Sequence, residues 1–158
     1  MSATPAVPAV PGLEAAFDVV VELGGVDDYG VTRAGHRRVI PISGGRITGA
    51  IEADILAGGA DWQLVRPDGA LEIDGRYSAR TPAGDLLYLQ VAGVRSGPPG
   101  VLAALLRGEA VEPSSYYFRT TVSIETSAAE FAHLQHTLFV ASCVREAATV
   151  RYTAYRVT

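Results

Sequence analysis

The sequence contains no lysine and no asparagine, so all 13 of its basic residues are arginine. The absence of lysine excludes chemistry that needs a Schiff base or an amine as general base, and it excludes a phosphate-binding loop that ends in Gly-Lys. The single cysteine, Cys143, excludes an internal disulfide framework and a zinc site made of several cysteines. No apolar run approaches the roughly 20 residues that cross a bilayer as a helix. These absences predict a cytoplasmic protein with no cofactor and no membrane partner.

The remaining composition fits one globular domain. The 158 residues are 48% apolar and 19% charged, which is enough to bury one core but too little for two. The formal net charge of −4 argues against nucleic acid as a partner. Pro5, Pro8 and Pro11, without a basic start or an apolar run, predict that residues 1–15 form a flexible arm and not a secretory signal. The domain is then expected over residues 16–158.

Apolar and polar residues alternate with a period of two along most of the chain after residue 16. The apolar members of three such predicted strands are Phe17, Val19, Val21 and Leu23; Ile47, Ile51 and Ile55; and Leu71, Ile73 and Tyr77. Turn sequences at residues 67–69 and 82–85 separate strands at the spacing of an antiparallel meander. Residues 138–144 and 150–157 predict a final hairpin.

Only two helices are predicted, and both are short. One follows Pro99, and the other spans residues 128–135 after a capping box formed by Ser127 and Glu130. Many strands with so few helices leave a sandwich or a barrel, and the glycine pair at 44–45 favours a barrel because closure needs strong curvature. The predicted fold class is all-β and mainly antiparallel. We expect a single closed or nearly closed barrel of about 8–10 strands, similar to calycins and allene oxide cyclases.

A first candidate site lies between residues 116 and 121. On a strand, Tyr117 and Arg119 share one face, whereas Phe118 and Thr120 share the other. If the first face lines a cavity, the guanidinium of Arg119 is placed to bind a carboxylate or enolate oxygen as a catalytic residue, and Tyr117 contacts the substrate. The alternative is a structural ion pair between Arg119 and an acidic residue on its own or a neighbouring strand.

A second candidate site begins at Asp61 and Trp62, after the glycine pair at 58–59. Asp61 is a candidate general acid or base. Trp62 offers a ligand a flat apolar wall, or alternatively plugs one end of a barrel. Arg76 and Tyr77 point to opposite faces of one strand, so only one of them faces a given cavity. Tyr77 is the candidate catalytic hydroxyl, and Arg76 and Tyr88 are candidate substrate contacts.

The histidines form a third candidate site. His133 and His136 lie three residues apart on the second predicted helix and so share a face. A metal needs a third ligand, and the remaining histidine, His36, lies among arginines that repel a cation, so no metal is predicted. His136 is a candidate for proton transfer near neutral pH, with His133 and Gln135 as substrate contacts. The alternative is that these are ordinary surface residues. The arginines at 33–38 are expected on a charged edge strand, with an anion-binding site as the alternative.

Several short motifs follow one another along the chain in a characteristic order. They are Ile42-Ser43-Gly44-Gly45, residues 58–63, Asp68-Gly69, residues 74–77, residues 81–84 and residues 116–120. In this order they resemble the domain-of-unknown-function family 3237, the UPF 0311 proteins. The resemblance runs from about Phe17 to Val157 and implies a small β-barrel that associates as a homodimer, without an established general activity. Where the family tends to carry a Trp-Leu-Asn-like string, this chain has His133-Leu134-Gln135, which implies a different ligand or reaction if that region lines the cavity.

Three functions remain open. The first is a cofactor-independent enzyme of the isomerase, cyclase or lyase type. It would apply general acid–base chemistry to a small, mostly apolar carbonyl metabolite in the barrel, as in natural-product metabolism. The second is a barrel that binds such a metabolite without turnover. The third is a packed barrel that binds another protein through an exposed edge or the N-terminal arm. The enzyme is the leading hypothesis, because its chemistry needs no metal, nucleotide or lysine.

Overall fold

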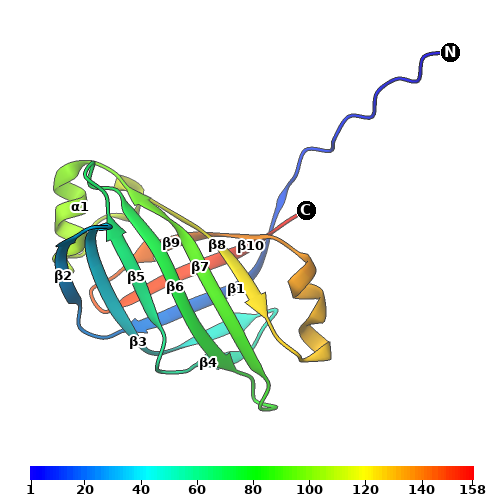
Figure 1. The fold of residues 1–158 in the computed structure, drawn as a ribbon. Coiled ribbons are helices and arrows are strands. Elements are labelled where there is room, and N and C mark those ends of the chain that lie inside the picture. The colour runs from blue at the N-terminus through cyan, green and yellow to red at the C-terminus, as the bar shows by residue number, and fades with distance from the viewer.

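The computed structural model describes all 158 residues and contains ten strands, one short α-helix and two 3-10 segments (Figure 1). The strands are β1 (Leu13–Leu23), β2 (Asp27–Thr32), β3 (Gly35–Gly49), β4 (Ala53–Ile55), β5 (Ala60–Val65), β6 (Leu71–Arg80), β7 (Leu86–Ser96), β8 (Tyr117–Glu125), β9 (Phe139–Arg145) and β10 (Thr149–Val157). The helix is α1 (Pro99–Leu106), and the 3-10 segments are η1 (Pro113–Ser115) and η2 (Ala129–His136). Strand β1 begins three residues before the expected domain boundary, and the residues before it extend away from the barrel in Figure 1.

The sheet closes on itself because β1 pairs with β10 on one side and with β3 on the other. The ring runs from β1 through β10, β9, β8, β7 and β6, then through β4 and β5, which share one position, to β3. The result is a closed antiparallel barrel of eight strand positions, with β2 attached to β3 outside the ring. The predicted all-β barrel is confirmed.

The seam between β1 and β3 depends on Gly45, which lies opposite Val21. Its backbone has a φ of 139°, and a Cβ atom added there would lie 2.1 Å from the carbonyl oxygen of Val20. Only glycine fits this close approach of two backbones. The glycine-rich string at 44–45 therefore closes the barrel, as its sequence predicted.

Alternation of side chains along each strand separates the inside of the barrel from the outside. In β6, Leu71, Ile73 and Tyr77 are buried, whereas Arg76 and Ser78 between and beyond them are exposed. The inward residues of the whole ring join in one hydrophobic cluster of 27 buried residues. The predicted strand faces in β1 and β6 are confirmed.

The two short helices lie at opposite ends of the barrel (Figure 1). Helix α1 buries Leu102 and Leu105 at one end, and η2 buries Phe131 and Leu134 at the other. The predicted helix after Pro99 is confirmed. None of these helices has the length and hydrophobicity that crossing a bilayer requires.

The predicted capping box is wrong. No side chain of the residue before η2 caps it, and the segment is a 3-10 helix. Instead, the hydroxyl of Thr126 accepts the backbone N–H of Ala128, just before η2, and donates to the carbonyl of Leu86. The hydroxyl is thereby anchored to β7, a tertiary contact that local sequence does not reveal.

Two strand predictions are also corrected. The strand expected through Ile47, Ile51 and Ile55 is broken, because β3 ends at Gly49, whose φ is 112°, and β4 starts at Ala53. The arginines at 33–38 do not lie on an edge strand. There β3 has β2 on one side and β5 on the other, and β2 itself is the outer strand.

Candidate functional site

The barrel interior contains a cavity of about 40 Å³. Its wall is mostly apolar, from residues such as Val21, Ile42, Ile73, Val91 and Phe118. Five positions add polar groups to the wall: Asp61, Tyr77, Thr120, Cys143 and Tyr152. They come from β5, β6, β8, β9 and β10, so closure of the ring brings them together. The cavity is much smaller than the roughly 300–1,000 Å³ of sites for drug-sized ligands, so in this conformation it accommodates only a small molecule or the reacting end of a larger one.

Asp61 is the only acidic residue on the cavity wall. The side-chain amide of Gln63 donates to its Oδ2 at 2.8 Å, and the backbone N–H of Asp74 donates to its Oδ1 at 2.9 Å. Burial raises the pKa of the Asp61 carboxyl above its ordinary value, although these two hydrogen bonds and the charge of Arg95 oppose the shift. A carboxyl group whose proton affinity is raised and whose position is fixed on both oxygens is suited to general acid–base chemistry.

Tyr77 and Tyr152 meet across the barrel through a hydrogen bond between their hydroxyl groups. Both rings are buried. Burial raises the pKa of each phenol further above its ordinary value of about 10. Both therefore stay protonated. Since one hydroxyl donates to the other, the pair keeps one O–H that can donate to a bound molecule.

The cavity thiol is inert at neutral pH. Burial raises the pKa of Cys143 to about 11, and Thr120 is its hydrogen-bond partner at 3.7 Å. The thiolate is the nucleophilic form of cysteine, so Cys143 is not a nucleophile here. It belongs to the hydrophobic core.

Three arginines border this interior beneath α1. Arg95 is 2% exposed and its guanidinium lies 5.6 Å from the centre of the Phe118 ring, which lines the cavity. Arg38 is 7% exposed and donates to the carbonyl of Leu106 at the end of α1. Arg145 is partly buried and donates to the carbonyl of Thr149. Burial lowers the pKa of all three, and that of Arg95 to about 10; repulsion from the neighbouring arginines adds to the shift for Arg95 and Arg145. A guanidinium keeps its charge at neutral pH.

Sequence reasoning missed Arg95 and Arg145, although a signal was present, and it considered Arg38 only within the run at 33–38. Arg95 continues the inward row of Leu89 and Val91 in β7, and Arg145 continues the row of Ala141 and Cys143 in β9. A charged residue in phase with buried apolar neighbours marks a polar site inside a barrel. Applied strand by strand, this rule would have selected them.

Arg119 and Tyr117 lie outside the barrel. Their face of β8 is exposed, whereas Phe118 and Thr120 face inward. Arg119 stacks 5.5 Å from the centre of the Tyr117 ring and donates to a backbone carbonyl. The expectation that this face lines the cavity is wrong, because the strand could present either face and the larger apolar row, with Phe118, is buried. No ion pair involves Arg119 either.

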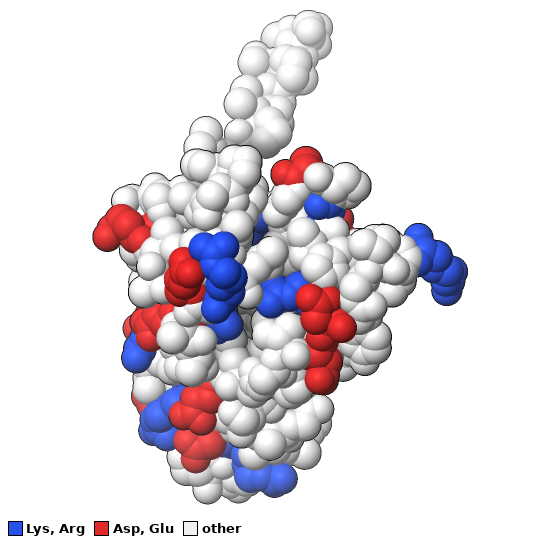
Figure 2. All heavy atoms as spheres, turned by 90° about the vertical axis from the view of Figure 1, so that its left-hand side faces the viewer, with Lys and Arg blue, Asp and Glu red and all other residues white.

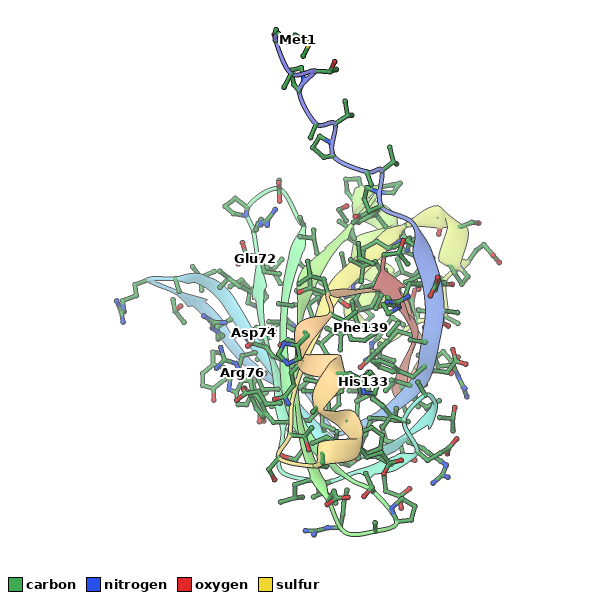
Figure 3. The ribbon with its side chains drawn as sticks, turned by 90° about the vertical axis from the view of Figure 1, so that its right-hand side faces the viewer. Met1, Glu72, Asp74, Arg76, His133 and Phe139 are labelled. Atoms are coloured by element: carbon green, nitrogen blue, oxygen red, sulfur yellow. The ribbon has the colours of Figure 1, made fainter.

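Trp62, Arg76 and Tyr88 also lie on the outer surface, where they line a shallow groove beside Gly58. Trp62 is 40% exposed, so it neither plugs the barrel nor reaches its interior. Arg76 pairs with Asp74 at 3.2 Å. Figure 3 shows Glu72, Asp74 and Arg76 following one another along β6. Of this predicted site, only Asp61 and Tyr77 face the cavity.

His133, Gln135 and His136 lie on η2, at the end of the barrel opposite α1 (Figures 1 and 3). All three are exposed, while Phe131 and Leu134 of the same segment face the core. Gln135 accepts the backbone N–H of Thr126 at 3.3 Å, which is a structural contact. The structure does not bring these residues to the cavity, because η2 turns its polar side to solvent.

Fold and site together define a small closed β-barrel with a polar, arginine-bordered interior at one end. The chain belongs to the family described as "Protein of unknown function (DUF3237)", which matches residues 11–157. The family resemblance noted in the sequence is thereby confirmed.

Similar proteins are known from bacteria and a fungus. A UPF0311 protein of Bradyrhizobium diazoefficiens is 39% identical over 131 residues, covering 83% of this chain and 86% of that protein. The crystal structure of a conserved protein of unknown function from Rhodopseudomonas palustris has a TM-score of 0.90 at 34% identity, covering 96% of this chain and all of that one. A structure described as an enzyme from Penicillium herquei has a TM-score of 0.72 at 16% identity, covering 98% of this chain and all of that one, and shares the fold.

Proposed function

We propose that the protein is a cofactor-independent enzyme that transfers a proton next to the carbonyl group of a small, mostly apolar molecule held in the barrel. The reaction is of the isomerase, cyclase or lyase type. The observation that carries this proposal is the Asp61 carboxyl on the wall of a mostly apolar cavity. The fungal barrel described as an enzyme supports it to the extent that the fold is compatible with catalysis.

Asp61 acts as the general base and acid. Gln63 and the N–H of Asp74 each occupy one lone pair of its carboxylate, and each oxygen keeps a second lone pair for a substrate proton. The raised pKa of Asp61 makes it a stronger base than an exposed aspartate. The two donors keep the carboxylate in place, so no reorganisation is needed when the proton arrives.

The tyrosine pair stabilises the negative charge that develops on the substrate oxygen. Asp61 lies opposite Gly75 in the β5–β6 ladder, and Tyr77 is the next inward residue of β6. The free O–H of the Tyr77–Tyr152 pair donates to the carbonyl oxygen, and this bond strengthens as the oxygen becomes an enolate. Gly75 leaves room for the substrate between these groups, since it has no side chain.

The proton balance needs no other reagent. Asp61 removes a proton from the carbon beside the carbonyl, the electron pair moves onto the oxygen, and the enolate is held by the tyrosine O–H. Return of the same proton to another carbon gives an isomer. Expulsion of a β-substituent from the enolate, with the proton passing from Asp61 to the leaving group, gives a lyase reaction, and the intramolecular reverse of this step gives a cyclisation.

The proposal is tested by proton exchange in D₂O. A panel of small ketones, aldehydes and keto acids is incubated with the protein, and the protons beside each carbonyl are followed by ¹H NMR. We expect at least one compound to exchange its protons faster in the presence of the wild-type protein than in its absence. The substitution Asp61→Asn should lower that exchange rate by roughly 10²-fold or more. Tyr77→Phe should lower it less, by about 10-fold or more.

The matched control is Asp54→Asn, because Asp54 is exposed on β4 and pairs with Arg46 away from the cavity. Its exchange rate should equal that of the wild type. If compounds bind but none exchanges its protons, the protein is a carrier and not an enzyme. A barrel that binds none of the panel would instead favour a protein-interaction module.

A further inference from the structure

The end of the barrel under α1 holds more positive charge than its own residues neutralise. Arg38, Arg95 and Arg145 share this end with one partly buried carboxylate, that of Asp61. None of the eight ion pairs in the protein includes any of the three arginines. Asp28, the other carboxylate whose charge reaches Arg38, is half exposed and bound to His36.

Unfilled hydrogen bonds occur at the same place. Two buried side-chain atoms in the protein have no hydrogen-bond partner, Nε of Arg95 and Oε1 of Gln63. Gln63 is 4% exposed, lies opposite Arg38 in the β3–β5 ladder, and holds Asp61 through its amide. The Nε–H of Arg95 is a buried donor without an acceptor, and a carboxylate oxygen is an acceptor that can fill this place.

We propose that Arg38, Arg95 and Arg145 bind the carboxylate of a small organic acid at the α1 end of the cavity. A guanidinium is a planar fork of donors that matches a carboxylate, and a dry site strengthens the pairing. Phe118 and the other apolar residues of the cavity wall contact the carbon part of the molecule. That the same molecule carries the reacting carbonyl rests on the proposed function, and it defines the substrate class as a short keto acid or a related carbonyl acid.

Asp61 links the arginine end of the barrel to the catalytic groups, because its neighbour Gln63 lies opposite Arg38 in the β3–β5 ladder and Asp61 itself lies opposite Gly75 in the β5–β6 ladder. Asp61 is bound to Gln63 on the arginine side, and it lines the cavity together with Tyr77. The arginines bind and orient, whereas Asp61 moves the proton. These roles can therefore be separated by mutation.

The test compares pyruvate with its uncharged isostere pyruvamide, by NMR titration of the full-length protein. We expect pyruvate to bind the wild type at least 10-fold more tightly than pyruvamide. Arg95→Met should weaken pyruvate binding at least 10-fold and leave pyruvamide binding within 2-fold. The matched control is Arg119→Met on the outer face, which should change neither affinity. Should Arg95→Met fail to fold, Arg145→Met at a partly exposed position gives the same comparison.

Asp61→Asn separates this inference from the proposed function. It removes the one negative charge that competes for the arginines, so pyruvate binding should be retained or tighter while proton exchange is lost. If the wild type binds pyruvate but does not exchange its protons, the proposed enzyme function is overturned and the proposed anion site is supported. Equal affinities for pyruvate and pyruvamide, no binding of pyruvate, or unchanged pyruvate binding in the arginine variants would each overturn the anion site.

Discussion

Most arginines on the outside of the barrel have carboxylate partners, whereas the arginines on the inside have none. Six exposed arginines each lie within 3.3 Å of a carboxylate: Arg46, Arg66, Arg76, Arg107, Arg151 and Arg156. Figure 2, which looks onto the α1 end, shows basic and acidic groups interspersed over that face. The three arginines inside this end have no carboxylate within ion-pair distance.

The contrast is the reverse of what stability alone would select. An exposed charge is hydrated and gains little from a partner, whereas a buried charge needs one. Carboxylate partners are present at exposed arginines, where they add little to stability. They are absent at the inner arginines, where a partner would add most. Buried charges that the fold does not neutralise are typical of sites where a ligand completes the arrangement.

The largest effect is expected from disrupting the β1–β3 seam, which closes the barrel and so separates its inside from its outside. Gly45→Ala places a Cβ 2.1 Å from the carbonyl oxygen of Val20, at a φ that side chains rarely adopt. Backbone strain and overpacking should lower the free energy of unfolding by about 3 kcal/mol or more. Urea unfolding followed by circular dichroism measures it. The matched control is Gly25→Ala, which has open space around it and should differ little from the wild type. A Gly45→Ala protein of wild-type stability would show that the β1–β3 seam is not tightly closed.

A smaller effect, of opposite sign for the two regions, is expected from removing one arginine in each. Arg95→Met replaces a buried, unpaired charge with an apolar chain of similar length and should be neutral or stabilising by about 1–4 kcal/mol. Arg46→Met removes an exposed pair with Asp54 and Glu52 and should destabilise by at most about 1 kcal/mol. Both are read from urea unfolding without ligand. Strong destabilisation by Arg95→Met would mean that the inner charge is already compensated in the empty protein.

The subtlest difference is expected in the pH dependence of stability. The native pKa of Asp61 is raised by burial, so the native state holds this proton more tightly and stability falls as pH rises above about 3.9, the ordinary value for Asp. The Tm of Asp61→Asn minus that of the wild type should therefore increase as pH rises from 3 to 7. The pKa of Asp28 is lowered, first by the N–H of Gly30 and then by His36. Asp28→Asn should lose in Tm over the same range. Parallel Tm curves for the two variants would contradict the assignment of Asp61 to a buried site.

Much of the fold was predictable from local pattern. Alternation found the strands around Phe17 and Leu71 and the last hairpin, and Pro99 marked α1, because these signals lie within a few neighbouring residues. The start of η2 was not predictable from its local motif, because the hydroxyl that contacts the backbone there belongs to Thr126, which is held by its hydrogen bond to the carbonyl of Leu86. The position of the arginines at 33–38 within the sheet depended on which strands came to lie beside them.

The candidate site divides in the same way. Asp61 and Tyr77 were identifiable as chemically capable residues on inward or corner positions, and both line the cavity. Arg119 was equally capable but faces outward, and Arg95 was overlooked. A period of two tells which residues share a face, but it does not tell which face is inside when both contain apolar groups.

The sequence by itself determined that this protein is an all-β barrel of one family, without lysine chemistry, and it determined which residues lie in phase with one another. Only the tertiary structure decided that Phe118 and not Arg119 faces inward, and that Asp61, Arg95 and Tyr152 from three separate strands meet inside one ring. The physical reason is that strand alternation is a local property of the chain, whereas the closure of β1 on β3 is set by contacts between residues far apart in sequence.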